Sequence, residues 1–127
     1  MSNWDSFIEE QLIGSGHISQ ACILGYSGDI LASSKGFKID SGEITKIINS
    51  FEDLPNLLAE GLHINGMKYS VTRAESTIIT AKKGPVGAIC IKTKQTVLIG
   101  LYDETMKSTK SVEIMNELSS YLSTNGY

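Results

Sequence analysis

The chain has 127 residues, of which 41% are hydrophobic, and its 11 basic and 14 acidic side chains leave a formal net charge of −3. This balance is typical of a folded globular domain and excludes a disordered or low-complexity chain. One domain of this length buries enough surface to fold without a disulfide or a metal, whereas two would each be too small. A pI of about 5.3 and a single arginine argue against nucleic acid as a partner.

The cysteines and the N-terminal segment bear on the compartment. Cys22 and Cys90 each lie inside an apolar run without metal-binding spacing, so two reduced core thiols are expected. The first residues are neither basic nor continuously apolar, so no signal peptide is predicted. No apolar run approaches the roughly 20 residues that span a bilayer. We therefore expect a soluble protein of the cytoplasm.

The first half of the chain predicts a helix, a hairpin and a second helix. Apolar residues recur at helical spacing near the start, and glycines at 14 and 16 end that helix. Asp40 and Glu43 mark the start of another amphipathic helix. The predicted elements are a helix over 2–13, strands over 21–25 and 30–34, a helix from 40–43 to 53–55, and a short helical or irregular piece over 56–60.

The second half predicts consecutive strands and then one long amphipathic helix that carries Val112, Met115 and Leu118. Asn65–Gly66 is the strongest two-residue hairpin signal in the chain. The predicted strands cover 62–64, 68–73, 77–81, 86–92 and 96–102.

Strands joined by tight turns predict an antiparallel meander whose apolar faces need covering. The expected fold class is α+β: a central antiparallel sheet of six to seven strands, with the N- and C-terminal helices packed on one face and shorter helices on the other. One domain over 1–127 is expected, because no linker or internal repeat interrupts the chain.

No motif for catalysis stands out. The sequence lacks the phosphate-binding loop, the dinucleotide fingerprint, the zinc-protease pattern and the nucleophile elbow. His17 and His63 have no acid or thiol at ligand spacing, and adjacent acids such as Glu9 and Glu10 are expected to face solvent. No catalytic residue, metal site or cofactor is therefore predicted, and a binding protein is favoured over an enzyme.

Aromatic residues gather at the two ends of the chain. Trp4 and Phe7 lie one turn apart in the first predicted helix, and Tyr121 and Tyr127 lie on or just past the last. If the terminal helices pack side by side, these four side chains converge at one edge. Exposed parallel aromatics bind polyproline II helices, whereas an inter-helix core is the alternative interpretation.

Charge is distributed unevenly along the chain. Residues 1–60 carry nine acidic and three basic side chains, whereas residues 61–102 carry six basic side chains against Glu75 alone. A basic stretch in an acidic protein predicts a docking surface for an acidic partner, with a solvated sheet face as the alternative.

Several segments, taken together and in order, resemble the profilin family. They are WDSFI, ACILGYSGDILASS, GLHINGMKYSVTR, AKKGPVGAICIKT, GLYDE and SYLSTNGY. The resemblance covers essentially the whole chain and supports the same fold. It implies a cytoplasmic, cytoskeleton-associated protein that binds monomeric actin on one face and proline-rich proteins such as formins on another, and many members also bind phosphoinositides.

The resemblance also implies site residues. The proline-binding groove would use Trp4, Phe7, Leu31, Tyr121 and Tyr127. Phe7 replaces a tyrosine and Leu31 replaces a strand tryptophan of the family, which implies a weaker or re-tuned groove that multivalent proline-rich tracts still occupy. The actin face would use Lys68, Ser70, Val71, Arg73, Lys82, Lys83, Lys92, Lys110, Glu113 and Glu117.

Glu117 is a departure on the actin face, because many relatives carry lysine there. Lys107 and Lys110 partly compensate, and one inverted rim charge tunes affinity rather than abolishing it. An interaction module that has lost actin binding stays open as an alternative. Another is a membrane-surface protein that binds phosphatidylinositol bisphosphate, which the net charge of −3 opposes; its residues would be Arg73, Lys82, Lys83 and Lys92.

Overall fold

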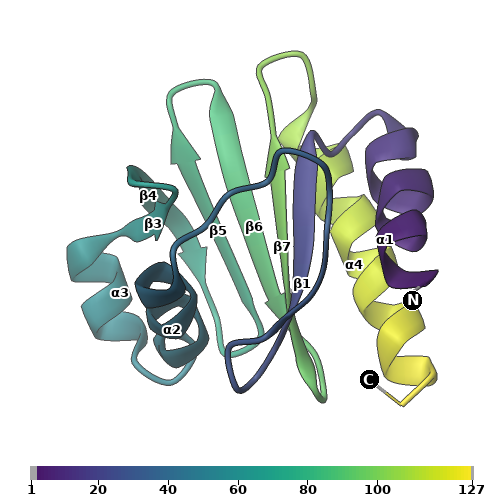
Figure 1. The fold of residues 1–127 in the computed structure, drawn as a ribbon. Helices are drawn as coiled ribbons and strands as arrows, with labels where there is room; N and C mark the ends of the chain where they lie inside the picture. The colour runs from purple at the N-terminus through teal and green to yellow at the C-terminus, as the bar shows by residue number, and fades with distance from the viewer. Residues whose placement is uncertain (1–2, 127) are drawn as a thin grey trace.

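A single seven-stranded sheet, with helices on both faces, organises the molecule (Figure 1). The computed structural model describes the backbone of residues 3–126 and the side chains of residues 5–126. The strand order is β2-β1-β7-β6-β5-β4-β3, and all neighbours pair antiparallel. The strands are β1 (Gln20–Gly25), β2 (Ile30–Ser33), β3 (Leu62–Ile64), β4 (Met67–Ala74), β5 (Ile78–Lys83), β6 (Val86–Lys92) and β7 (Thr96–Tyr102).

The helices cover the sheet in two pairs (Figure 1). They are α1 (Asn3–Phe7), continued by the turns η1 (Ile8–Leu12) and η2 (Ile13–Ser15), then α2 (Ser41–Ser50), α3 (Leu54–Glu60) and α4 (Ser108–Thr124). We call the side covered by α1–η2 and α4 the terminal-helix face, and the side covered by α2 and α3 the middle-helix face. This arrangement confirms the predicted α+β fold.

Each face of the sheet has its own core because side chains alternate along the strands. On β1, Ile23 lies in the core of the terminal-helix face, whereas Cys22 and Leu24 lie in that of the middle-helix face. Cys22 and Cys90 are buried free thiols, as predicted. Burial raises the pKa of both thiols, that of Cys90 to about 12, so both stay protonated at neutral pH.

The N-terminal helix is less regular than predicted. Where the pattern indicates one α-helix, the chain forms an α-helical turn, a π-helical turn over η1 and a 3₁₀ turn over η2. Residues five apart align in a π-turn, so Ile13 packs on the same core as Ile8 and Leu12. Gly16 then ends the segment with a left-handed φ of 79°, as the predicted stop requires.

One carboxylate joins α2 to the turn between β3 and β4. Asp40 and Glu43 form the capping box that begins α2. The Glu43 carboxylate also accepts the backbone N–H groups of Asn65 and Gly66, each at 2.7 Å. Both turn residues have positive φ, as the predicted two-residue hairpin needs. Partial burial opposes the charge on Glu43, but the three backbone donors and nearby His63 lower its pKa below the ordinary value.

Glu43→Gln is expected to lower the free energy of unfolding by about 1–2 kcal/mol at pH 7, because an amide NH₂ then faces a backbone donor. Since the folded-state pKa of Glu43 is depressed, its contribution is present above the unfolded-state value of 4.5 and is lost as pH falls through the folded-state value. Urea unfolding at pH 7 and pH 3 measures this, with exposed Glu60→Gln as the control. A deficit that persists undiminished at pH 3 contradicts the assignment.

Candidate binding surfaces

A groove runs between the N-terminal helical segment and α4. The Phe7 and Tyr121 rings stack in it, with centroids 5.3 Å apart and an interplanar angle of 26°. Tyr121 is 55% exposed, so the pair is not closed into the core. Trp4 lies on α1, although its side chain, like the whole of Tyr127, is outside the described residues. The groove is lined by Phe7, Glu10, Gln11, Leu12, Gly14, Ser15, Ile114, Glu117, Leu118 and Tyr121.

Leu31 lies on the same face of the sheet as this groove. In the β1–β2 pairing, Ile23 pairs with Ala32 and the next residue, Leu24, pairs with Ile30. Leu31 lies between these two pairs and is therefore a bulge residue. A Cβ built on Gly25 would lie 4.0 Å from Leu31 Cδ1, and Gly25 shares the terminal-helix face with Ile23. Leu31 is 44% exposed. It therefore offers an aliphatic surface on the side of the sheet that carries the aromatic pair.

Two acidic side chains of the N-terminal helical segment, Asp5 and Glu9, join this segment to the edge strand β2 and the residues that follow it. Asp5 Oδ1 accepts the Ser33 N–H at 3.1 Å, and Glu9 Oε2 accepts the Lys35 N–H at 3.0 Å. Glu9 is thus half-buried and hydrogen-bonded, whereas Glu10 is exposed as expected. An edge strand exposes unpaired N–H groups, and a nearby carboxylate satisfies them. Helical spacing alone does not show this, because β2 is distant in sequence.

Beside α4, polar side chains occupy β4 and β5 on the terminal-helix face. Thr80 pairs with Ile89, which lies in the core of that face, so Thr80 and its β4 partner Arg73 also face that way. Lys82 and its partner Ser70 follow by alternation. We call this set the open strand surface; it consists of Lys68, Ser70, Thr72, Arg73, Thr80 and Lys82.

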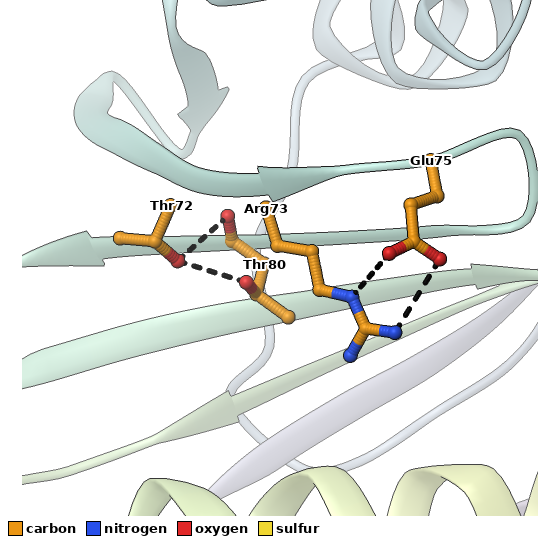
Figure 2. A network of polar contacts seen from close by, with 4 residues as sticks. All are labelled: Thr72, Arg73, Glu75 and Thr80. Carbon is orange, nitrogen blue, oxygen red and sulfur yellow. Dashed lines mark hydrogen bonds and ion pairs between the residues drawn. The ribbon is translucent and has the colours of Figure 1, made fainter.

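A polar network orders part of this surface (Figure 2). The Thr72 hydroxyl donates to the Thr80 carbonyl at 3.2 Å and lies 2.8 Å from the Thr80 hydroxyl. Arg73 Nε donates to Glu75 at 2.8 Å. The hydrogen bond and opposite charge raise the pKa of Arg73 and lower that of Glu75. The bulge at Thr72 puts Thr72 and Arg73 on one side, which strict alternation would have separated.

Two of the residues assigned to the actin face by resemblance point elsewhere. Val71 packs against the core of the middle-helix face. Lys83 pairs with Val86, which packs against the same core, so Lys83 and Lys82 leave the sheet in opposite directions. Of Val71, Lys82 and Lys83, only Lys82 therefore lies on the open strand surface.

Lys92 lies apart from Lys82 and Lys83, at the far end of β6 from the residues that pair with them. Its Nζ is 3.6 Å from Glu52 and 5.4 Å from the centroid of the Tyr26 ring. The structure therefore does not bring together the four residues assigned to phosphoinositide binding, which are Arg73, Lys82, Lys83 and Lys92.

The assigned residues of α4 lie on its exposed side. Lys110 Nζ is 3.5 Å from Glu113, and both side chains are 57% exposed. Glu117 lines both the groove with Phe7 and Tyr121 and a second, shallow groove along α4. That second groove is lined by Thr109, Val112, Glu113, Asn116, Glu117 and Ser120. Sequence reasoning missed Asn116, Thr72 and Thr80, because their place depends on the helix orientation and the bulge.

No group of three or more His, Cys, Asp or Glu side chains among residues 5–126 is arranged to hold a metal ion. Within the described backbone, none of the helices combines the length and the apolar character that crossing a bilayer requires.

The fold and these surfaces define a small α+β protein with an aromatic groove between its terminal helices and a polar, cationic strand surface beside α4. The family model for profilin matches residues 2–127. Profilin-A of Physarum polycephalum is 38% identical over 125 residues, which are 98% of this chain and 99% of that protein. The chain belongs to the profilin family.

Solved structures give the same result. Profilin II of Acanthamoeba castellanii is 30% identical and superposes with a TM-score of 0.94 over 98% of this chain and 99% of its own. Two neighbours of lower identity share the fold. Mouse profilin IIa in complex with a double repeat from the FH1 domain of mDia1 has a TM-score of 0.80 at 19% identity, over 99% of this chain and 100% of its own. LokiProfilin1 in complex with rabbit actin has a TM-score of 0.79 at 16% identity, over 98% of this chain and 97% of its own.

Proposed function

We propose that this chain binds proline-rich segments in the groove between its terminal helices and monomeric actin through the open strand surface and the adjoining side of α4. The exposed Phe7–Tyr121 stack, in a chain of the profilin family, is the observation that carries the proposal. The complexes of related folds with a formin repeat and with actin support it. In this proposal the protein acts in the cytoplasm by binding, without a catalytic step.

The groove suits a polyproline II helix, which presents flat pyrrolidine rings to aromatic side chains. Phe7 and Tyr121 supply two such rings, and Leu31 on the same face supplies aliphatic contact. An aromatic contact contributes about 1 kcal/mol beyond its buried area. Replacing a strand tryptophan with Leu31 therefore weakens the groove without removing it.

Trp4 provides the test of the groove, because it is the only tryptophan and lies on α1. Titration with polyproline is expected to change Trp4 emission saturably. A parallel calorimetric titration of Trp4→Ala is expected to show weaker binding or none. An emission that stays constant up to millimolar peptide, with no heat of binding, contradicts the proposal.

The open strand surface suits an acidic partner. Lys68, Arg73 and Lys82 share it, and Glu75 alone among the acidic residues of 61–102 offsets them. Complementary charge speeds association more than it strengthens the final complex. Glu117, one helix turn from Glu113, adds a negative charge to the exposed side of α4.

Lys82→Glu is expected to weaken actin-monomer binding about five- to tenfold at low salt, chiefly through a slower association rate. Lys83→Glu makes the same charge change one residue away on the opposite side of the sheet, and less than about a twofold effect is expected. Stopped-flow association with labelled monomeric actin measures both. Equal effects of the two variants contradict the assignment of the surface.

A further inference from the structure

The proposed proline-binding groove has an acidic wall and no cationic residue. Glu10 and Glu117 line it from opposite helices. No lysine or arginine occurs in residues 1–34 or 111–127, which supply the N-terminal helical segment, the β1–β2 hairpin and most of α4. A bound segment therefore meets negative charge there with no basic side chain of the groove to neutralise it.

The two carboxylates lie on the same side of the aromatic pair. The N-terminal segment and α4 run in opposite directions (Figure 1), so the step from Phe7 forward to Glu10 and the step from Tyr121 back to Glu117 lead the same way. Each step is about one helical turn, or roughly 5 Å. One end of the groove is thus aromatic and the adjoining stretch is acidic.

These carboxylates are free to act on a ligand. Asp5 and Glu9 are engaged with backbone N–H groups of the β2 edge. Glu10 and Glu117 are exposed, and within residues 5–126 neither takes part in a hydrogen bond or ion pair with another side chain. The groove therefore combines a ring stack with two unneutralised negative charges one turn away.

We propose that this groove selects proline-rich segments that carry a lysine or arginine two or three residues from the proline stacked on Phe7 and Tyr121. A polyproline II helix rises about 3.1 Å per residue, so two residues span about 6 Å, close to one helical turn. The basic side chain then lies beside Glu10 and Glu117. This inference rests on the proposed function and names the class of ligand that the groove prefers.

The expected preference is moderate, because both carboxylates are exposed. Exposed ion pairs are weak and screened by salt. Two such contacts together predict about a three- to tenfold tighter binding of a basic proline-rich peptide at low ionic strength. At high ionic strength this preference is expected to shrink, while the contribution of ring stacking persists.

The test uses two fluorescent peptides of equal length, a proline tract containing one lysine and the same tract with glutamine in its place. Anisotropy titrations compare the wild-type chain with Glu10→Gln/Glu117→Gln. The control variant is Glu60→Gln/Glu104→Gln, which removes two charges from exposed positions outside the groove. The wild type and the control are expected to prefer the lysine peptide, and the groove variant to bind both peptides alike.

The outcomes separate this inference from the proposed function. Equal binding of both peptides by the wild type overturns the inference and leaves proline binding intact. A lysine preference that survives in the groove variant also overturns it, because the charge then acts elsewhere. Binding of neither peptide rejects proline binding itself, and the inference with it. Loss of the preference in the groove variant alone, with unchanged affinity for the glutamine peptide, supports it.

Discussion

Tyr121→Ala is expected to weaken binding of a proline-rich peptide about 10- to 30-fold. The ring is 55% exposed and stacks on Phe7, so it is available to a ligand and already held in place. Aromatic side chains at the centre of an interface commonly contribute about 2 kcal/mol or more when truncated. The same exposure limits its role in stability, and the free energy of unfolding is expected to fall by about 1 kcal/mol or less.

Isothermal titration with polyproline, paired with thermal unfolding, measures both quantities on one sample. Tyr121→Phe is the matched control, because it keeps the ring and removes only the hydroxyl. It is expected to retain binding within about threefold. If Tyr121→Ala binds polyproline as tightly as the wild type does, the ligand does not occupy the groove between the terminal helices.

The largest expected effect on stability comes from Gly87→Ala, a single added methyl group. Gly87 on β6 pairs directly with Tyr102 on β7, and the Tyr102 ring lies over it. A Cβ at Gly87 would be 2.2 Å from Tyr102 Cζ, closer than real contacts allow. The ring is only 6% exposed and belongs to the core beneath α4, so it has little room to move. We expect a loss of about 2–3 kcal/mol in the free energy of unfolding.

Denaturant unfolding tests this expectation, with Gly84→Ala as the comparison in the same hairpin. Gly84 has a φ of +62° and nothing within 4 Å of an added Cβ, so its substitution introduces backbone strain alone, about 1 kcal/mol. A loss for Gly87→Ala no larger than that for Gly84→Ala would show that the Tyr102 ring moves aside. Because Gly87 also pairs with Lys82, weakened actin binding is expected to accompany the lost stability.

Local signals in the sequence predicted most of the secondary structure. Asn65–Gly66 marked the β3–β4 hairpin because few residue pairs tolerate the positive φ angles of such a turn. Asp40 and Glu43 marked the start of α2 because they satisfy its first N–H groups. Regular alternation and helical spacing then placed the remaining strands and α4 within a few residues of their observed bounds.

The candidate sites were less predictable, because membership of a surface depends on register and on contacts between distant segments. The bulges at Leu31 and Thr72 change which side chains share a face of the sheet, and the local sequence pattern does not predict either bulge. Adjacent Lys82 and Lys83 look equivalent in the sequence, yet strand alternation sends them to opposite sides. Lys92 looks like part of the same basic stretch but lies at the other end of β6, beside Glu52.

The sequence by itself determined the fold class and the order of the elements, because turn residues, helix caps and apolar periodicity act over a few residues and therefore can be read locally. The resemblance of its segments, spread over the whole chain, indicated the family. Only the tertiary structure decided that Phe7 stacks on Tyr121 and that Arg73 and Lys82 share one surface. It also decided that Glu9 accepts a backbone hydrogen bond just after β2, whereas Glu10 lines the groove. These relations join residues far apart in the chain. They follow from strand pairing and helix packing, which one-dimensional patterns do not contain.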